Sequence, residues 1–169
     1  MADVARWVAR RRVALGFACG AAALWLAEPT RGSMIAGGVV ALTGEALRIW
    51  AAGHLEKGRE VTTTGPYRFT RHPLYMGSTI MGVGLVVAAR SAVVAVLVIA
   101  YLGVTLAAAI RTEEAHLTEK FGAAYPHYRD GRARGDARRF SAARAVRNRE
   151  YRALAGLLVA FALLALRLR

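Results

Sequence analysis

Two short stretches of the sequence combine charged, aromatic and helix-starting residues that together can bind a charged small molecule. The first, residues 65–75, reads GPYRFTRHPLY and sets His72 and Tyr75 on either side of a proline. Proline is favoured in the first turn of a helix, whose free N–H groups form a natural anion site. The second stretch, residues 111–128, begins with an arginine and two adjacent carboxylates. Carboxylates accept hydrogen bonds, and tyrosine rings attract cations.

The apolar segments beside these stretches predict that the two lie close together. Residues 74–89 and 91–110 are uncharged and are separated only by Arg90, which indicates a tight antiparallel helical hairpin. No helix breaker follows the second segment, so we expect its helix to continue as far as Gly122. The start of one helix and the extension of the other must then be neighbours. The topology therefore brings the histidine and tyrosine of the first stretch to the carboxylates of the second.

The composition indicates a membrane protein. Of 169 residues 56% are hydrophobic, yet 24 Lys and Arg against 11 Asp and Glu give a net charge of +13. The charged and apolar residues separate along the chain, and a helix of about 20 apolar residues crosses a bilayer core. We predict an all-α, polytopic protein with a single integral membrane domain, residues 1–169. Its roughly five transmembrane helices are expected at 13–27, 33–52, 74–89, 91–110 and 151–167, although the last can instead lie flat on the membrane surface.

The basic residues predict the orientation, because Lys and Arg accumulate in cytoplasmic loops. They concentrate before the first apolar segment, between the second and third, and between the fourth and fifth. This pattern puts the N-terminus and the motif-bearing segments 53–73 and 111–150 in the cytoplasm, and favours a prokaryotic inner membrane. A triple arginine before an apolar run also resembles a signal peptide, but the lack of a small-residue cleavage site favours a retained helix. The charge then needs no nucleic-acid partner.

Several further patterns bear on packing and on metals. Gly77, Gly82 and Gly84 predict a face on which helices pack closely. Glu45 and Arg48 stand three residues apart and can pair on one helix face. One cysteine excludes an internal disulfide, and the histidines show no metal-ligand spacing, so no metal site is expected.

The two motifs resemble those of the isoprenylcysteine carboxyl methyltransferase family, whose relatives include the membrane phospholipid N-methyltransferases. The matching pattern is Gly65-x-Tyr67-x3-Arg71-His72-Pro73-x-Tyr75, then Glu113-Glu114-x2-Leu117-x3-Phe121-Gly122-x2-Tyr125-x2-Tyr128. The resemblance covers about residues 54–128. It implies an integral membrane enzyme that binds S-adenosyl-L-methionine in a pocket at the cytoplasmic face.

By this resemblance, the cofactor contacts come from the loop before the third apolar segment, from the start of that segment and from the second motif. A carboxylate such as Glu113 can accept hydrogen bonds from the ribose hydroxyls or the ammonium group of the cofactor. Tyrosine faces suit its sulfonium cation, and the free N–H groups of a helix start suit its carboxylate. The expected cofactor-binding residues are His54, Glu60, Val61, Thr62, Tyr67, Arg71, His72, Pro73, Leu74, Tyr75 and Glu113.

The substrate side is expected at residues where the resemblance weakens. Arg111 can orient a carboxylate by a bidentate contact, but the eukaryotic enzymes carry their substrate-side arginine further upstream, near Ala109. After Tyr128 this chain continues with a basic stretch in place of the family's short tail, and residues 148–150 are predicted to close the pocket instead. The second carboxylate of the pair is either a site residue or part of a solvated helix face. The expected catalytic residues are Arg111, Glu114, Asn148, Arg149 and Glu150.

The predicted function is methyl transfer from S-adenosylmethionine to a lipophilic substrate drawn from the bilayer. Such a displacement requires the nucleophile and the methyl group to be held in line at about 3 to 3.5 Å. Carboxyl O-methylation of an isoprenylcysteine-like acceptor is the first expectation, and N-methylation of a phospholipid is the alternative. Two other classes are an NADPH-dependent membrane reductase relative and a non-catalytic membrane interaction protein.

Overall fold

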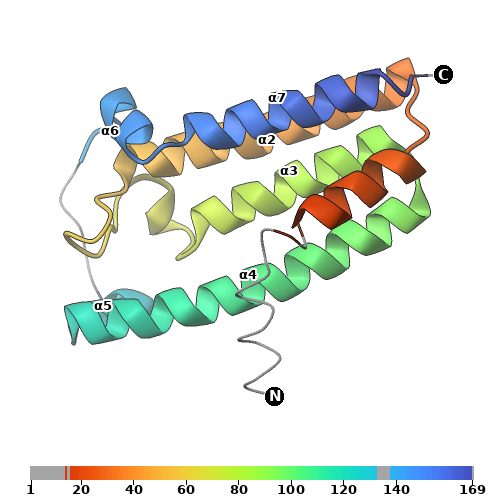
Figure 1. Cartoon of the computed structure of the whole chain (residues 1–169). Helices are drawn as coiled ribbons and strands as arrows, with labels where there is room; N and C mark the ends of the chain where they lie inside the picture. Colours follow the sequence, from red (N-terminus) through yellow and green to blue (C-terminus); the bar gives the residue numbers. More distant parts are fainter. Residues whose placement is uncertain (1–13, 15, 133–137, 169) are drawn as a thin grey trace.

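The computed structural model describes residues 14, 16–132 and 138–168, and the regular elements in these ranges are all helical (Figure 1). The first helix runs from Gly16 to Leu26. It is followed by α2 (Arg31–His54), η1 (Gly65–Arg68), α3 (Pro73–Ala89), α4 (Ala92–Phe121), α5 (Ala124–Arg129), α6 (Ala142–Arg147) and α7 (Tyr151–Ala165). The all-α prediction is confirmed for these residues.

The long helices coincide with the predicted apolar segments. Both α2, with 24 residues, and α4, with 30, are long and apolar enough to cross a membrane, while the first helix, α3 and α7 are shorter apolar helices. The five-crossing topology therefore remains a prediction. As expected, α4 continues beyond its apolar part and ends at Gly122, whose φ is +51°. Pro73 occupies the first turn of α3.

The helices α2 and α3 pack with their backbones in direct contact. A Cβ atom built on Gly44 would lie 2.6 Å from the carbonyl oxygen of Gly77, and one on Gly84 would lie 2.5 Å from the amide nitrogen of Ala41. Such distances leave room only for hydrogen, and small residues at helix contacts permit this approach in a membrane. The predicted packing face is confirmed for Gly77 and Gly84, whereas Gly82 faces α4.

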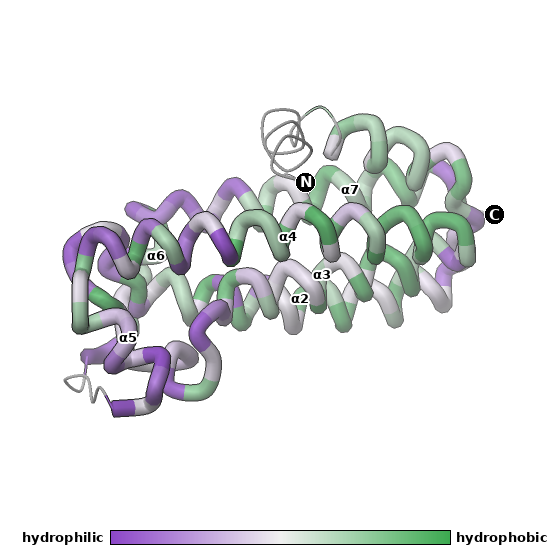
Figure 2. Tube along the Cα trace, turned by 90° about the horizontal axis from the view of Figure 1, so that it is seen from below, coloured by the Kyte–Doolittle hydropathy of each residue, from purple (hydrophilic) through white to green (hydrophobic). Residues whose placement is uncertain are grey.

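The helix α4 stands apart from this tightly packed pair. It joins α3 through Arg90, in the left-handed conformation at φ +53°, and diverges from α3 toward its C-terminal end (Figure 1). Val94, near that turn, is its one buried residue among those described. The α7 helix lies along α2 on the opposite side (Figure 1). Hydrophilic residues gather at the end of the bundle that carries α5 and α6 (Figure 2).

A cluster of charged side chains lies inside the bundle. Arg48 of α2 donates through Nε and Nη2 to the same carboxylate oxygen of Glu150, both at 2.6 Å. Its Nη1 group donates to the Leu74 carbonyl oxygen at 3.1 Å and to the Ser78 hydroxyl at 2.5 Å. The predicted pair with Glu45 is present at 3.8 Å, although neither oxygen of this buried carboxylate accepts a hydrogen bond from a described residue. Arg48 therefore ties α2 to α3 and to the start of α7.

Candidate active site

A cavity of about 940 Å³ lies between α4 and the segments that lead into α3. Its outer wall is the loop formed by residues 55–62, and residues 67–75 form a second wall. One face of α4 closes it from Tyr101 to Phe121, and two tyrosines of α5 complete the lining. A cavity of this size can enclose a ligand as large as a nucleoside cofactor.

The cavity brings the two sequence motifs together at the open end of the α3–α4 hairpin, where α3 begins and α4 ends. Ten of the predicted cofactor residues line it: Glu60, Val61, Thr62, Tyr67, Arg71, His72, Pro73, Leu74, Tyr75 and Glu113. The meeting of the motifs, which the hairpin topology required, is confirmed. The roles of these residues toward a cofactor remain predictions.

His54 is placed behind the cavity wall and does not line the cavity. It is buried at the end of α2, with Nδ1 3.1 Å from the hydroxyl oxygen of Thr64. Its ring fills the space beside Gly65, where a Cβ atom would lie 2.5 Å from the imidazole Cδ2. Gly65 also has a φ of +58°, which favours glycine. His54 thus supports the turn that carries Tyr67.

The two adjacent carboxylates of the second motif have different surroundings. Glu114 accepts hydrogen bonds from Arg71 Nη1 at 3.1 Å and from His72 Nε2 at 3.0 Å. Glu114 does not line the cavity. Its hydrogen bonds connect α4 to the residues that lead into α3. Glu113 lines the cavity and forms no ion pair with any described residue. Of the two, Glu113 is the one available to a ligand.

The other predicted substrate-side residues lie outside the cavity lining. Arg111 is exposed on α4. The lining residues Ala109, Thr112 and His116 follow one another three and four residues apart on one face, and the turn of about 100° per residue puts position 111 on the other face. Asn148 donates from Nδ2 to the carbonyl oxygen of Ala52 in α2 and to that of Leu55, the residue that follows α2. Arg149 has a φ of +62° at the turn into α7, and Glu150 holds Arg48. The structure therefore gives Asn148 and Glu150 contacts with α2, and residues 148–150 are not among those that line the cavity.

Residues of α4 that sequence reasoning missed share one helix face with Glu113. The signal was available, because stepping three or four residues along the helix from a predicted site residue keeps to the same face. These lining residues are Tyr101, Thr105, Leu106, Ala108, Ala109, Thr112, His116, Leu117, Lys120 and Phe121. Arg48, Leu55, Glu56, Lys57 and Gly58 line the cavity from α2 and from the outer wall, and no local pattern identified them.

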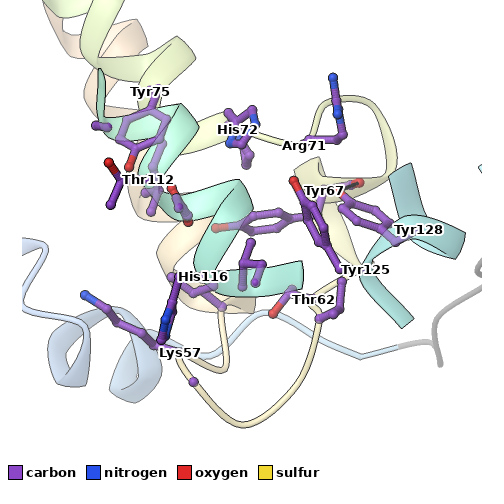
Figure 3. A pocket seen from close by; sticks show the side chains of 18 of the residues that line it. Lys57, Thr62, Tyr67, Arg71, His72, Tyr75, Thr112, His116, Tyr125 and Tyr128 are labelled. Carbon is purple, nitrogen blue, oxygen red and sulfur yellow. Dashed lines mark hydrogen bonds between the residues drawn. The ribbon is translucent and has the colours of Figure 1, made fainter. Parts of the chain in front are cut away.

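Three tyrosines form one side of the cavity. Figure 3 shows Tyr67, Tyr125 and Tyr128 grouped together, with Lys57 and His116 on another side. The Tyr128 hydroxyl donates to the carbonyl oxygen of Tyr67 at 2.7 Å. Burial raises the pKa of Tyr128 to about 12 and, together with nearby negative charge, the pKa of Tyr125 to about 12. Both hydroxyls are therefore neutral hydrogen-bond donors at neutral pH.

Removing the Tyr128 hydroxyl is expected to loosen the wall that carries Tyr67. A Tyr128→Phe variant leaves a partly buried carbonyl without its donor, which costs about 1–2 kcal/mol of unfolding free energy. Thermal unfolding in detergent measures the loss as a lower midpoint. Tyr151→Phe is the control, because the Tyr151 side chain is exposed on α7. Equal midpoints for the two variants would contradict the role given to this hydrogen bond.

Fold and site together describe a helical protein that has two helices long and apolar enough to cross a membrane and a cavity between its two motifs. A sequence model of the phospholipid methyltransferase family matches residues 12–124. This match covers about two thirds of the chain, and the chain belongs to that family of membrane methyltransferases. The resemblance to membrane methyltransferases is thereby confirmed. No curated protein and no solved structure matches the chain.

Proposed function

We propose that this protein transfers a methyl group from S-adenosylmethionine to a membrane lipid. The observation that carries the proposal is the lining of the cavity, which combines the charged motif residues with a more apolar stretch of α4. The lining face of α4 continues to Phe121, and within it Tyr101 comes first and Glu113 lies well inside. Twelve residues separate them, about 18 Å along a helix. A polar cofactor and an apolar acceptor can therefore occupy the same cavity.

The residues at the charged end have the chemistry that the cofactor needs. Glu113 is a carboxylate without an ion-pair partner among the described residues, and it suits ribose hydroxyls or an ammonium group. The rings of Tyr67 and Tyr75 line the same region and suit a sulfonium cation. Bound there, S-adenosylmethionine supplies the methyl group, and the protein holds donor and acceptor in line.

The pairing of charges in the cavity favours an amine as the methyl acceptor. Arg71 and Arg48 line the cavity, but each is already held by a glutamate. Two lysines that line the cavity form no ion pair with a described residue. Lys57 belongs to the outer wall, and Lys120 lies at the C-terminal end of α4. A carboxylate that entered along the apolar face of α4 would meet no unpaired cation, whereas a neutral amine needs none. N-methylation of an aminophospholipid is therefore our first candidate.

Carboxyl O-methylation of an isoprenylcysteine-like lipid is the second candidate, because both motifs resemble enzymes with that activity. In either case we place the protein in the membrane as one integral domain, with the N-terminus and the cavity mouth in the cytoplasm. The collection of hydrophilic residues at one end of the bundle supports this orientation (Figure 2). A prokaryotic inner membrane is the location we propose.

Calorimetry in detergent tests the cofactor, with S-adenosylhomocysteine and NADPH as the two ligands. Binding of S-adenosylhomocysteine is expected; binding of NADPH alone would indicate a reductase, and binding of neither a non-catalytic protein. Transfer of labelled methyl to a lipid extract then tests the acceptor. Base releases the label from an ester but leaves it on nitrogen, so a base-stable product is expected for an aminophospholipid.

Neutralising Glu113 is expected to weaken cofactor binding without unfolding the protein. A hydrogen bond to a charged group contributes about 1.5–3 kcal/mol, so Glu113→Gln should raise the Kd for S-adenosylhomocysteine by roughly 10- to 100-fold. Glu119→Gln is the matched control, because Glu119 is exposed on the same helix and does not line the cavity. Equal Kd values for both variants would exclude Glu113 from the cofactor site.

A further inference from the structure

The C-terminal end of α2 is covered by a segment that comes more than eighty residues later in the chain. The last carbonyl groups of any helix lack partners within it. Here Asn148 donates from Nδ2 to the carbonyl oxygens of Ala52 at 2.8 Å and of Leu55 at 2.9 Å. Arg144 donates from Nη1 to the carbonyl oxygen of Gly53 at 2.6 Å. A distant segment thus satisfies the helix end from which the outer wall of the cavity departs.

Arginines of the same segment also hold the carboxylates of the outer wall. Glu56 accepts hydrogen bonds from Arg144 Nε at 2.7 Å and from Arg147 Nη2 at 3.1 Å. Glu60 pairs with Arg138 Nη2 at 2.6 Å. The hydrogen bond from Arg144 holds the pKa of Glu56 below its ordinary value, so Glu56 stays ionised at neutral pH. Both glutamates line the cavity.

The partner of Arg48 belongs to the same part of the chain. Arg48, Glu56 and Glu60 line the cavity, and each is neutralised by a residue between positions 138 and 150. The match to the phospholipid methyltransferase family ends at residue 124. Residues 138–150, which we call the C-terminal brace, therefore lie outside the region that matches the family. In Figure 1 the brace, with α6, lies against the end of α2.

The outer wall needs such an external support. Residues 55–62 form no helix or strand, and Gly58 has a φ of +72°. An irregular loop keeps much conformational freedom unless contacts fix it. Within the loop, the backbone N–H of Glu56 donates to the Thr62 hydroxyl at 3.2 Å. The ion pairs of Glu56 and Glu60, by contrast, are formed with arginines of the brace. The contacts that fix the wall against the rest of the protein thus come from the brace.

We propose that the C-terminal brace positions the outer wall for cofactor binding, and that Arg144 is its central positioning residue. Arg144 binds a helix-end carbonyl and a wall carboxylate at once, so its side chain fixes the wall relative to α2. It does not line the cavity and acts through Glu56. The inference rests on the proposed function, because the ligand held by the wall is taken to be S-adenosylmethionine.

The test is calorimetry of the full-length protein with S-adenosylhomocysteine. Arg144→Ala is expected to raise Kd roughly tenfold, the size of coupling found within ion-pair networks. Arg144→Lys should recover part of the affinity, because lysine can still pair with Glu56 but cannot reach the carbonyl at the same time. Arg139→Ala is the matched control: it removes the same charge from the same segment, and the Arg139 side chain is exposed and makes no ion pair with a described residue.

A double-mutant cycle with Glu56→Gln separates positioning from loss of structure. If Arg144 acts through Glu56, the double variant binds no more weakly than Arg144→Ala alone. A variant that merely unfolds in part lowers the binding stoichiometry and leaves Kd unchanged, and that result would overturn the proposal. An unmodified protein that fails to bind S-adenosylhomocysteine would overturn the proposed function and this inference with it. Normal binding by both the unmodified protein and Arg144→Ala would overturn the brace alone.

Discussion

Replacing Gly84 by leucine is expected to prevent α2 and α3 from packing and to abolish the folded protein. A Cβ atom at this position would already lie 2.5 Å from the Ala41 amide nitrogen and 2.6 Å from the Gly37 carbonyl oxygen. These are backbone atoms, which cannot rotate away as the end of a side chain can. We expect a loss of about 3 kcal/mol or more, at the upper end of overpacking costs. Thermal unfolding in detergent and the yield of monodisperse protein measure it.

A graded series makes this prediction specific to the close contact. Gly84→Ala should already lower the unfolding midpoint, because even a methyl group requires the two helices to separate. Gly103→Leu is the control: a Cβ atom at Gly103 of α4 has no neighbour within 4 Å, so this variant should unfold like the unmodified protein. Similar midpoints for Gly84→Leu and Gly103→Leu would show that α2 and α3 do not pack as described.

Replacing Arg48 by methionine is expected to be the most destabilising loss of a single charge. Glu150 and Glu45 have side chains that are 7% and 2% exposed, and both would lose their cation. Breaking a buried ion pair by removing one partner costs about 3–5 kcal/mol, because the remaining charge stays without compensation. The unfolding midpoint of Arg48→Met in detergent should fall accordingly. Arg31→Met, at an exposed position of the same helix, should have little effect.

Replacing Glu45 and Glu150 together with Arg48 should restore much of the stability lost in Arg48→Met. Methionine at all three positions replaces the buried charges by apolar side chains of similar length, an exchange that is often neutral or stabilising. Ser78 keeps its own hydrogen bond to the Leu74 carbonyl oxygen at 3.0 Å, so no polar group of α3 is left unpaired by the change. If the triple variant were no more stable than Arg48→Met, side-chain shape rather than charge would be responsible.

The sequence was sufficient to predict the long apolar helices and the meeting of the two motifs, but not the short helices η1, α5 and α6. Uninterrupted apolar segments locate the helices, and Pro73 and Gly122 mark where two of them begin and end. The two residues between α3 and α4, Arg90 and Ser91, leave only a hairpin as their arrangement. The motifs, at the start of α3 and the end of α4, had to be neighbours, and the hydrogen bonds of Glu114 with Arg71 and His72 confirm it.

Which of the two adjacent carboxylates faces the cavity was not predictable in the same way. Glu113 and Glu114 are adjacent, and a turn of about 100° between them decides which one faces the cavity. That angle depends on how α4 is rotated against α3, which sequence periodicity alone does not fix. The contacts of the C-terminal brace with the outer wall could not be predicted for a different reason. Arg144 and Glu56 are 88 positions apart, and no local pattern connects a basic stretch to one particular helix end.

The isolation of α4 has a consequence for what counts as part of the enzyme. One side of the cavity is a helix that contacts the first helix and α3 at Leu97 and Leu102 and is held at its far end by the hydrogen bonds of Glu114, while most of its residues are exposed or half-buried. In a membrane, acyl chains would cover its exposed surface, and their packing would set how far α4 stands from α3. The bilayer would then help to set the geometry of the cavity, and we expect the thickness and fluidity of the surrounding lipid to affect methyl transfer.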